Sequence, residues 1–374
     1  SGKSYALGTI VEEIHLWTEA DVVILDPNGD FGRLNDESLR SYAEIAKESS
    51  PNCLEPVDYE QYAKRHSIRR DSIRLLSRDS KLGKCLPIVA KLSDLDTKTL
   101  AMALGIRSDE HFAEYAELSD IRQGLSTKHQ KAGYDLHTFM RCCKSDNHPR
   151  ILNRIVASEL QSLPIWNGGQ TVKKYIEDET RRTIVIDLSD LSKMEKSIVS
   201  LVVFKALWEK QMQRKRNGEK KATILVMDEA HALFPRTPLS LDETLTLEWG
   251  AKMAGEGRKF GIYLMIASQL PSKIHNHVLT QCGSIVLMKM LSQSDIDALG
   301  DAFSYVPEML LQRSRHFGIG DSLAIGPVVP GKCLVHFEGR KTKQGGADLE
   351  VWWNMDVPNS CQLGHFAGHD GIPR

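Results

Sequence analysis

The sequence has almost no net charge and no apolar run long enough to cross a membrane. Lysine and arginine total 48 against 49 aspartates and glutamates, which leaves a formal net charge of −1 over 374 residues. This balance excludes a protein that binds nucleic acid through a global basic field, so any such partner must meet a local surface. The absence of a membrane-length apolar segment predicts that the protein has no membrane partner.

Cysteine is also scarce and unpatterned. Seven cysteines are scattered along the chain and no Cys-x-x-Cys occurs, which is typical of a reducing cytoplasm and predicts a cytoplasmic protein. His137, Cys142, Cys143 and His148 could be written as a metal cluster. Adjacent cysteines are poor partners for one tetrahedral zinc, and this spacing matches no standard pattern. We therefore favour free thiols over a zinc site.

The apolar residues that are present alternate between strand and helix patterns. Hydrophobic residues make up 41% of the chain, enough for a proper core. Continuous apolar strands separated by helices predict an α/β fold with a parallel sheet flanked by helices. We expect strands over 22–25, 183–188, 223–227 and 262–266, and helices over 5–16, 193–216 and 241–256.

The chain divides by pattern into four segments. The stretch from 36 to 182 is charged, with helical spacing in pieces such as 86–104 and few convincing strands, and we interpret it as a mainly helical insertion. Residues 322–325 and 333–337 suggest a closing hairpin. The predicted domains are the start of the core over 1–35, the insertion over 36–182, the remainder of the core over 183–340, and a C-terminal tail over 341–374.

Gly2-Lys3-Ser4 matches the end of the phosphate-loop signature G-x-x-x-x-G-K-[ST]. In such a loop, backbone N–H groups at a helix N-terminus hold anionic phosphates. Lys3 would reach the β- and γ-phosphates of ATP, and the Ser4 hydroxyl would coordinate Mg²⁺. Taken alone, the tripeptide is weak evidence for a phosphate loop, because similar tripeptides begin ordinary helices.

Two further signals occur at the ends of apolar strands. Asp228 and Glu229 follow the strand 223–227, where Asp228 would hold the Mg²⁺ shell and Glu229 would orient and deprotonate the attacking water. Gln269 follows the strand 262–266, where an amide can sense the γ-phosphate. Ligands of parallel sheets bind beyond the carboxyl ends of the strands. The three signals together predict a nucleoside-triphosphatase site.

These residues belong to a series of motifs that resembles the HerA-like ATPases, in the HerA/FtsK group of RecA-like P-loop enzymes. The most specific part is Gly257-Arg258-Lys259-Phe260-Gly261 followed by Ala267-Ser268-Gln269. In chain order the matching motifs are Gly2–Ser4, Leu25–Phe31, Val226–His231, Glu256–Gly261, Ala267–Ser272 and Leu279–Gly283.

The resemblance implies a RecA-like P-loop core, a homo-hexameric ring that hydrolyses ATP at subunit interfaces, and double-stranded DNA in a central pore. It suggests a bacterial source. It implies that an N-terminal β-barrel and the first core strand are absent from this chain, so that the chain is part of a longer protein. Where the family commonly has His-Gly-Glu, the chain has Asn28-Gly29-Asp30, and we assign Asp30 no role. The implied site comprises Ser1, Gly2, Lys3, Ser4 and Tyr5 for ATP, Ser4 and Asp228 for Mg²⁺, and Glu229, Gln269 and Arg258 for catalysis.

Arg258 admits two interpretations. In the family the arginine of Gly-Arg-Lys reaches a neighbouring subunit's γ-phosphate, where a guanidinium neutralises developing charge. Alternatively, Arg258 is a cation in a last helical turn, favourable to the helix dipole. The matching flanks favour the role in a neighbour's site.

DNA contacts are predicted for two loops that would face a ring pore. They are the loop 234–238, which carries Arg236, and the loop 271–275, which carries Lys273. A more basic run lies at the end of a helix, and we interpret it as a solvated helix terminus rather than a DNA site. Its members are Arg214, Lys215, Arg216, Lys220 and Lys221.

Two classes of function follow. The first is an ATP-driven DNA motor that works with a nuclease or another effector, in DNA-end processing or anti-phage defence. The second is a ring scaffold in which ATP binding assembles and activates an effector, with DNA translocation secondary. Glu229 and Arg258 are both present, which favours turnover and therefore the motor.

Overall fold

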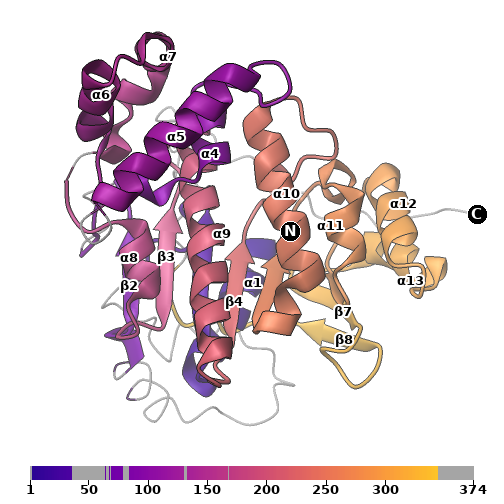
Figure 1. Ribbon diagram of the computed structural model, residues 1–374. Coiled ribbons are helices and arrows are strands. Elements are labelled where there is room, and N and C mark those ends of the chain that lie inside the picture. Colours follow the sequence, from indigo (N-terminus) through magenta and orange to yellow (C-terminus); the bar gives the residue numbers. More distant parts are fainter. Residues whose placement is uncertain are drawn as a thin grey trace, which may run out of the picture.

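The central element is a five-stranded parallel sheet in the order β2-β3-β1-β4-β5 (Figure 1). The computed structural model describes residues 2–35, 64, 67, 69–78, 84–129, 133–166 and 168–343. The strands are β1 Asp21–Asp26, β2 Ile73–Leu76, β3 Thr183–Asp187, β4 Thr223–Met227 and β5 Ile262–Ile266. The predicted parallel sheet is confirmed, including all four strands expected from the sequence.

Alternation along β1 assigns its side chains to the two faces of the sheet. Val22 and Ile24 pack with Leu7 and Val11 of helix α1 (Lys3–Trp17). Val23 and Leu25 belong to the larger core on the other face, together with the apolar side chains of α9 (Lys193–Arg216) and α10 (Leu241–Glu256). The sheet is thus covered on both sides, which is why its strands are continuously apolar.

Three helices build these layers. Ser192 caps α9 reciprocally with Glu195, which forms a capping box at the start of the helix. The helix α10 has the bounds expected from the sequence and runs directly into the 3₁₀ turn η6. Their bounds are α1 Lys3–Trp17, α9 Lys193–Arg216, α10 Leu241–Glu256 and η6 Gly257–Phe260.

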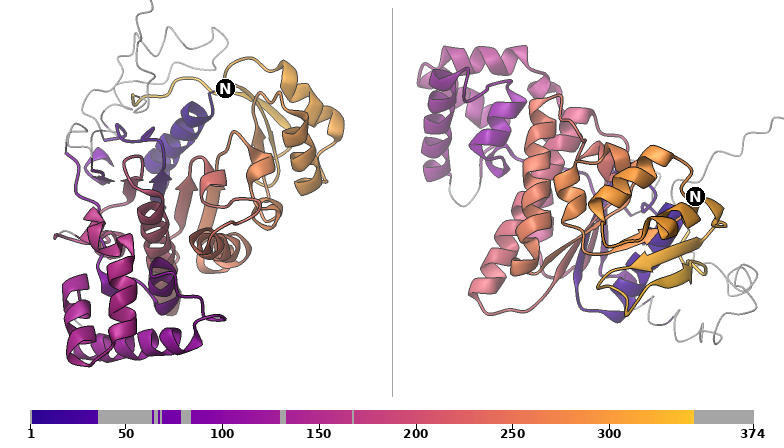
Figure 2. Two further views of the ribbon diagram at one scale, coloured as in Figure 1. Left: turned by 90° about the horizontal axis from the view of Figure 1, so that it is seen from above. Right: turned by 90° about the vertical axis from the view of Figure 1, so that its right-hand side faces the viewer.

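The segment between β1 and β3 contains both helices and a strand. Of its helices, α5, α6 and α7 lie beyond one end of the sheet, whereas α8 packs against α9 (Figures 1 and 2). Residues 73–76 form β2, an edge strand of the core sheet that the charged surroundings hid from the sequence analysis. The helices are α4 Thr97–Ala103, α5 Phe112–Lys128, α6 Leu136–Ser145, α7 Pro149–Ala157 and α8 Val172–Glu177.

The helix expected over 86–104 is mostly wrong. Leu86 bridges to Leu76 beside the sheet instead, and Pro87 follows it, a residue that disfavours a helix interior. The helix α4 begins only after Asp96, whose side chain accepts a hydrogen bond from the Thr99 N–H. Helical spacing of apolar residues therefore misled the interpretation, because a proline and a cap set the true start.

The C-terminal part of the described chain forms a second, smaller unit with its own apolar cluster. The antiparallel sheet β6-β7-β8 packs with α12 and α13, beside the start of α1 (Figure 2). The predicted closing hairpin is confirmed as β7 and β8. The elements are α11 Asn276–Thr280, β6 Ile285–Leu287, α12 Gln293–Ala302, α13 Glu308–Arg313, β7 Asp321–Ile325 and β8 Cys333–His336.

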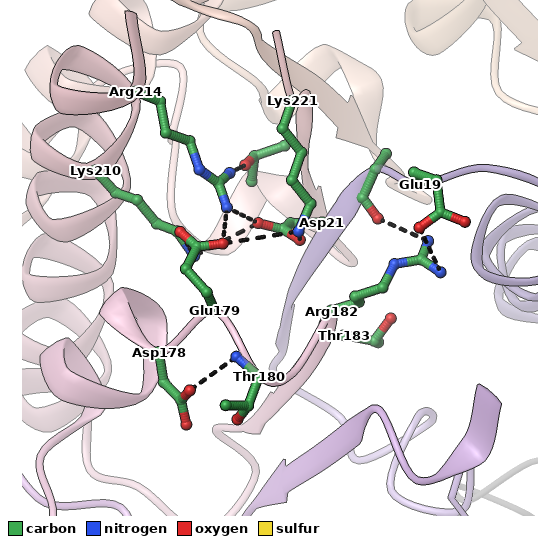
Figure 3. A network of polar contacts seen from close by, with 12 residues as sticks. Glu19, Asp21, Asp178, Glu179, Thr180, Arg182, Thr183, Lys210, Arg214 and Lys221 are labelled. Atoms are coloured by element: carbon green, nitrogen blue, oxygen red, sulfur yellow. Dashed lines mark hydrogen bonds and ion pairs between the residues drawn. The ribbon is translucent and has the colours of Figure 1, made fainter. Parts of the chain in front are cut away.

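The amino edge of the large sheet carries a buried ion-pair network (Figure 3). Arg214 of α9 is 3% exposed and donates to Asp21 at 2.7 Å and to Glu179. Lys210 lies 3.5 Å and Lys221 lies 2.7 Å from Asp21. Burial would raise the pKa of Asp21, but the Lys221 hydrogen bond and the neighbouring cations hold it below its usual value.

The network corrects the interpretation of the basic run as a solvated terminus. Lys215, Arg216 and Lys220 are exposed, as expected. Arg214 is buried instead, because its position on α9 faces the amino ends of β1 and β4. A helix-end arginine is therefore a structural ion here, not a surface charge.

Five cysteines in the described part of the chain, Cys85, Cys142, Cys143, Cys282 and Cys333, carry free thiols. Among the residues that the structure describes, no cluster of three or more His, Cys, Asp or Glu side chains could hold a metal ion. Across those same residues, no helix combines the length and apolarity needed to span a membrane.

Candidate active site

Asp228 and Ser4 meet at the carboxyl edge of β4. The Ser4 hydroxyl donates to one Asp228 carboxylate oxygen at 3.0 Å, although 224 residues separate them in sequence. The other carboxylate oxygen accepts the N–H of Glu229 at 2.9 Å. Burial raises the pKa of Asp228, while these two hydrogen bonds act in the opposite direction. A hydroxyl and a carboxylate side by side are hard oxygen ligands of the kind that Mg²⁺ binds.

Glu229 stands at the centre of the site in a strained backbone conformation. Its φ of 43° and ψ of 49° are left-handed, which is uncommon for a residue with a side chain. One carboxylate oxygen lies 3.6 Å from the Lys3 ammonium. The other accepts the backbone N–H of Gln269 at 3.2 Å. The backbone turn thus aims the carboxylate back toward the phosphate-loop lysine.

Helix α1 begins at this site, and within the described part of the chain no side chain caps its first turn. Gly2 is its N-cap residue, has a φ of 75°, and offers no side chain to the first-turn N–H groups. Those N–H groups and the positive end of the helix dipole are available to an anion. Lys3, Ser4 and Tyr5 all lie in this first turn. The predicted contribution of Ser1 lies outside the described residues.

One polar side chain of the site, that of His231, was not singled out by the sequence analysis. His231 lies 3.2 Å from a Glu229 oxygen and 3.1 Å from the Ser268 hydroxyl, so it links the ends of β4 and β5. The side chain of Gln269 is exposed at the same edge. The strand-end rule that located Asp228 and Gln269 could also have found His231, because it follows the same strand.

Arg258 does not join this group. It lies in η6, before β5 begins, whereas Gln269 lies after β5 ends. Five strand residues span roughly 17 Å, so Arg258 lies near the amino ends of the strands and Gln269 lies near their carboxyl ends. The Arg258 side chain is exposed and, among the described residues, makes no hydrogen bond or ion pair. This arginine is free to meet another molecule but not the site of its own chain.

A second carboxylate cluster lies at the same edge, next to the site. Asp26 ends β1 opposite Asp187 and accepts the backbone N–H groups of Gly29, Asp30 and Phe31 at 2.9, 3.1 and 2.8 Å. Burial raises the pKa of Asp26 to about 7, and the charges of Asp187 and Asp30 act in the same direction. This aspartate organises the turn after β1 rather than facing solvent.

The two loops predicted to contact DNA lie side by side. Pro235 and Ile274 form an antiparallel bridge, and the Arg236 N–H donates to the Lys273 carbonyl at 2.6 Å. The side chains of Arg236 and Lys273 are both exposed. Phe234, fully buried, anchors the first loop against α10. The structure therefore joins two segments about 35 residues apart into one basic surface.

Solved structures of two proteins share this fold. VirB4 of Thermoanaerobacter pseudethanolicus superposes with a TM-score of 0.53 at 13% identity, over 90% of this chain and 86% of that one. The bacterial conjugative coupling protein TrwB also gives a TM-score of 0.53, at 12% identity, over 93% of this chain and 86% of that one. At such low identity the likeness shows the fold alone, an α/β fold with a parallel sheet flanked by helices.

Sequence relatives identify the family more closely. The DNA double-strand break repair helicase HerA of Sulfurisphaera tokodaii is 28% identical over 218 residues, 56% of this chain and 42% of that protein. The HerA helicase of Sulfolobus acidocaldarius is 27% identical over 45% of this chain and 35% of its own length. The chain thus spans less than half the length of these relatives, and they do not bear out the suggested bacterial source. Residues 1–229 match the family model for the central domain of helicase HerA, and the chain therefore belongs to the HerA family.

Proposed function

We propose that the protein is an ATP-hydrolysing motor that translocates duplex DNA as a homo-hexameric ring. The observation that carries the proposal is the convergence of Lys3, Ser4, Asp228 and Glu229, with Ser4 3.0 Å from Asp228 and Lys3 3.6 Å from Glu229. These residue types in this arrangement are those of a phosphoryl-transfer site. The relatives named DNA double-strand break repair helicase support DNA as the substrate of the motor.

The site residues have distinct roles in ATP hydrolysis. The first-turn N–H groups of α1 and the Lys3 ammonium hold the phosphates of ATP. Ser4 and Asp228 would hold Mg²⁺, which neutralises phosphate charge when bound. Glu229 orients the attacking water and takes its proton, and the Gln269 amide senses the γ-phosphate. Ser1 and Tyr5 complete the proposed nucleotide contacts.

Arg258 supports a ring with shared sites. An exposed guanidinium at the edge opposite its own nucleotide site can serve hydrolysis only in a neighbouring subunit. There it would stabilise the charge that develops on the γ-phosphate, an effect of about 10³–10⁵ in rate for related arginines. A closed ring of six subunits gives every site such a neighbour.

The joined loops 234–238 and 271–275 form the proposed DNA surface in the pore. Their bridge holds Arg236 and Lys273 on one exposed surface. Repeated around a ring, these cations would bind the phosphate backbone without reading sequence, and binding would weaken steeply with salt. Further proposals are a cytoplasmic location and a partner nuclease or other effector, in DNA-end processing or anti-phage defence.

The test is ATP hydrolysis with and without linear duplex DNA. Wild-type activity is expected to rise with DNA, and Glu229→Gln is expected to abolish turnover while nucleotide binding persists. Arg258→Ala should also abolish turnover, whereas Lys259→Ala, which removes the adjacent exposed cation, should not. Slow hydrolysis that DNA does not stimulate would contradict the proposal of a DNA motor. If the Glu229→Gln variant also still assembles and activates a partner, the result would favour a ring scaffold.

Mixing the two inactive variants tests the shared site directly. Where an Arg258→Ala subunit provides the nucleotide site and its Glu229→Gln neighbour provides the arginine, the shared site contains one intact glutamate and one intact arginine. If Arg258 acts in the neighbour's site, mixed rings should recover part of the wild-type activity. Mixtures that stay inactive, although the subunits exchange, would contradict the role of Arg258 in a neighbouring subunit.

A further inference from the structure

The chain after β8 returns to the helix that begins the nucleotide site. Residues Gly339–Thr342, here called the strap, lie across α1. Arg340 in the strap is 1% exposed and is the largest fully buried side chain among the residues that the structure describes. Burying a guanidinium costs free energy unless its N–H groups donate hydrogen bonds. The acceptors of Arg340 therefore show which segments the strap holds together.

The strap is tied to the middle of α1 by a buried carboxylate. Glu12 is 2% exposed and accepts the backbone N–H groups of Lys341 at 3.0 Å and Thr342 at 2.8 Å, together with the Thr342 hydroxyl. At the surface, the Lys341 ammonium lies 2.6 Å from Glu13. These bonds fix the register of the strap on the helix.

The Arg340 guanidinium links the two backbone segments that border the nucleotide site. It donates to the Ser4 carbonyl at 3.3 Å, in the first turn of α1, and to the Asp30 carbonyl at 3.4 Å, in the turn after β1. The Arg340 N–H donates to the Tyr5 hydroxyl at 2.8 Å. Two guanidinium N–H groups and the backbone N–H of Arg340 therefore donate to residues within two positions of Lys3 or in the adjacent turn.

Helix α1 is shaped to admit this side chain. A Cβ added at Gly8 would lie 2.5 Å from the Arg340 Cζ atom, closer than real contacts allow. Glycine inside a helix costs about 1 kcal/mol relative to alanine. The helix thus carries glycine, a poor helix former, one turn after Ser4, where a larger residue would collide with the guanidinium. Because arginine keeps its charge at physiological pH, its hydrogen bonds to the two carbonyls are charge-assisted.

We propose that Arg340 is a positioning residue for ATP binding. It holds the first turn of α1 against the turn after β1, in the orientation that lets Lys3 and Ser4 meet the phosphates. The strap thereby makes nucleotide affinity depend on a segment that follows β8, more than 330 residues away in sequence. The proposal rests on the proposed function only for the identity of the ligand.

The experiment is titration of the purified chain with a fluorescent N-methylanthraniloyl-ATP, alongside steady-state hydrolysis. Arg340→Lys keeps the charge but cannot reach both carbonyls, and Gly8→Ala displaces the guanidinium without changing it. Each is expected to weaken binding about tenfold, the loss of one charge-assisted hydrogen bond. KM for ATP should rise to match while kcat changes less than twofold, because the strap does not touch Glu229. Lys332→Ala, which removes an exposed cation from the turn between β7 and β8, should bind as the wild type does.

The outcomes separate this proposal from the one it rests on. Wild-type affinity in Arg340→Lys and Gly8→Ala, with a lowered melting temperature, would show a merely structural arginine and overturn the proposal. Wild-type binding that Lys3→Ala leaves unchanged would overturn the proposed nucleotide site instead. If the variants do not fold, hydrogen exchange on the wild type decides. The nucleotide should slow exchange in the strap at Arg340–Thr342, and unaltered exchange there would contradict the coupling.

Discussion

Replacing Asp26 with asparagine removes a buried carboxyl at the end of β1 while keeping its shape. In the wild type, one carboxyl oxygen accepts the N–H groups of Gly29 and Asp30, and the other accepts that of Phe31. Asparagine can keep the first two bonds, but its amide nitrogen cannot accept the third. The variant is also neutral at every pH, so it separates the charge of Asp26 from the turn that it organises.

The expected magnitude follows from the pKa of Asp26, which rises from 3.8 in the unfolded chain to about 7 in the folded protein. Between these values the folded state holds a proton that the unfolded state has lost. The free energy of unfolding therefore falls as pH rises through this window, by about 1.4 kcal/mol per pH unit and about 4 kcal/mol in all. The lost acceptor costs the variant about 1–2 kcal/mol at any pH.

The assay is urea unfolding, followed by tryptophan fluorescence, for both proteins from pH 5 to pH 8. The two should be nearly equal in stability at pH 5, and the variant should be more stable by about 2–3 kcal/mol at pH 8. Asp120→Asn, which removes an exposed carboxylate from α5, controls for the change in net charge. Parallel pH profiles for wild type and Asp26→Asn would refute the reasoning, because the buried charge would then carry no penalty.

Two further predictions concern packing and the ion-pair network. Gly250→Ala should lower stability by about 1–3 kcal/mol, because a Cβ there would lie 2.2 Å from a buried aromatic ring. Gly255→Ala, in the same helix with only one atom within 4 Å at 3.9 Å, should be neutral or slightly stabilising in the same thermal melt. Arg214→Ala should cost about 2–3 kcal/mol in urea unfolding, since it leaves buried Asp21 with fewer partners. Arg216→Ala removes an exposed cation of the same run and should change the free energy of unfolding by less than about 0.5 kcal/mol. If both variants lost the same free energy of unfolding, that result would contradict the buried network.

Local rules predicted much of the core. The strands 223–227 and 262–266 and the helix 241–256 have the bounds expected from apolar patterning. The capping box at Ser192 is a contact within four residues, so short-range chemistry suffices to locate it. Where local rules failed, over 86–104 and at β2, a proline or a long-range pairing overrode the apparent periodicity.

The candidate site was predicted only as a set of separate motifs. Placing Asp228 and Gln269 at the carboxyl ends of strands needed only the rule for parallel sheets. The left-handed turn at Glu229 and the bridging position of His231 depend on how β4 and β5 align, which no short window encodes. Arg340 carried no motif at all, because its partners lie at the other end of the chain.

The amino-acid sequence by itself determined the strands and helices of the core and the residue types at their ends, because hydrophobic periodicity, caps and turn residues act over a few neighbours. Only the tertiary structure decided which of those ends meet. Ser4 reaches Asp228 because α1 packs on the sheet beside β4, and Arg258 is kept from its own site because β5 separates them. Such meetings depend on strand order and register, which the whole core sets at once.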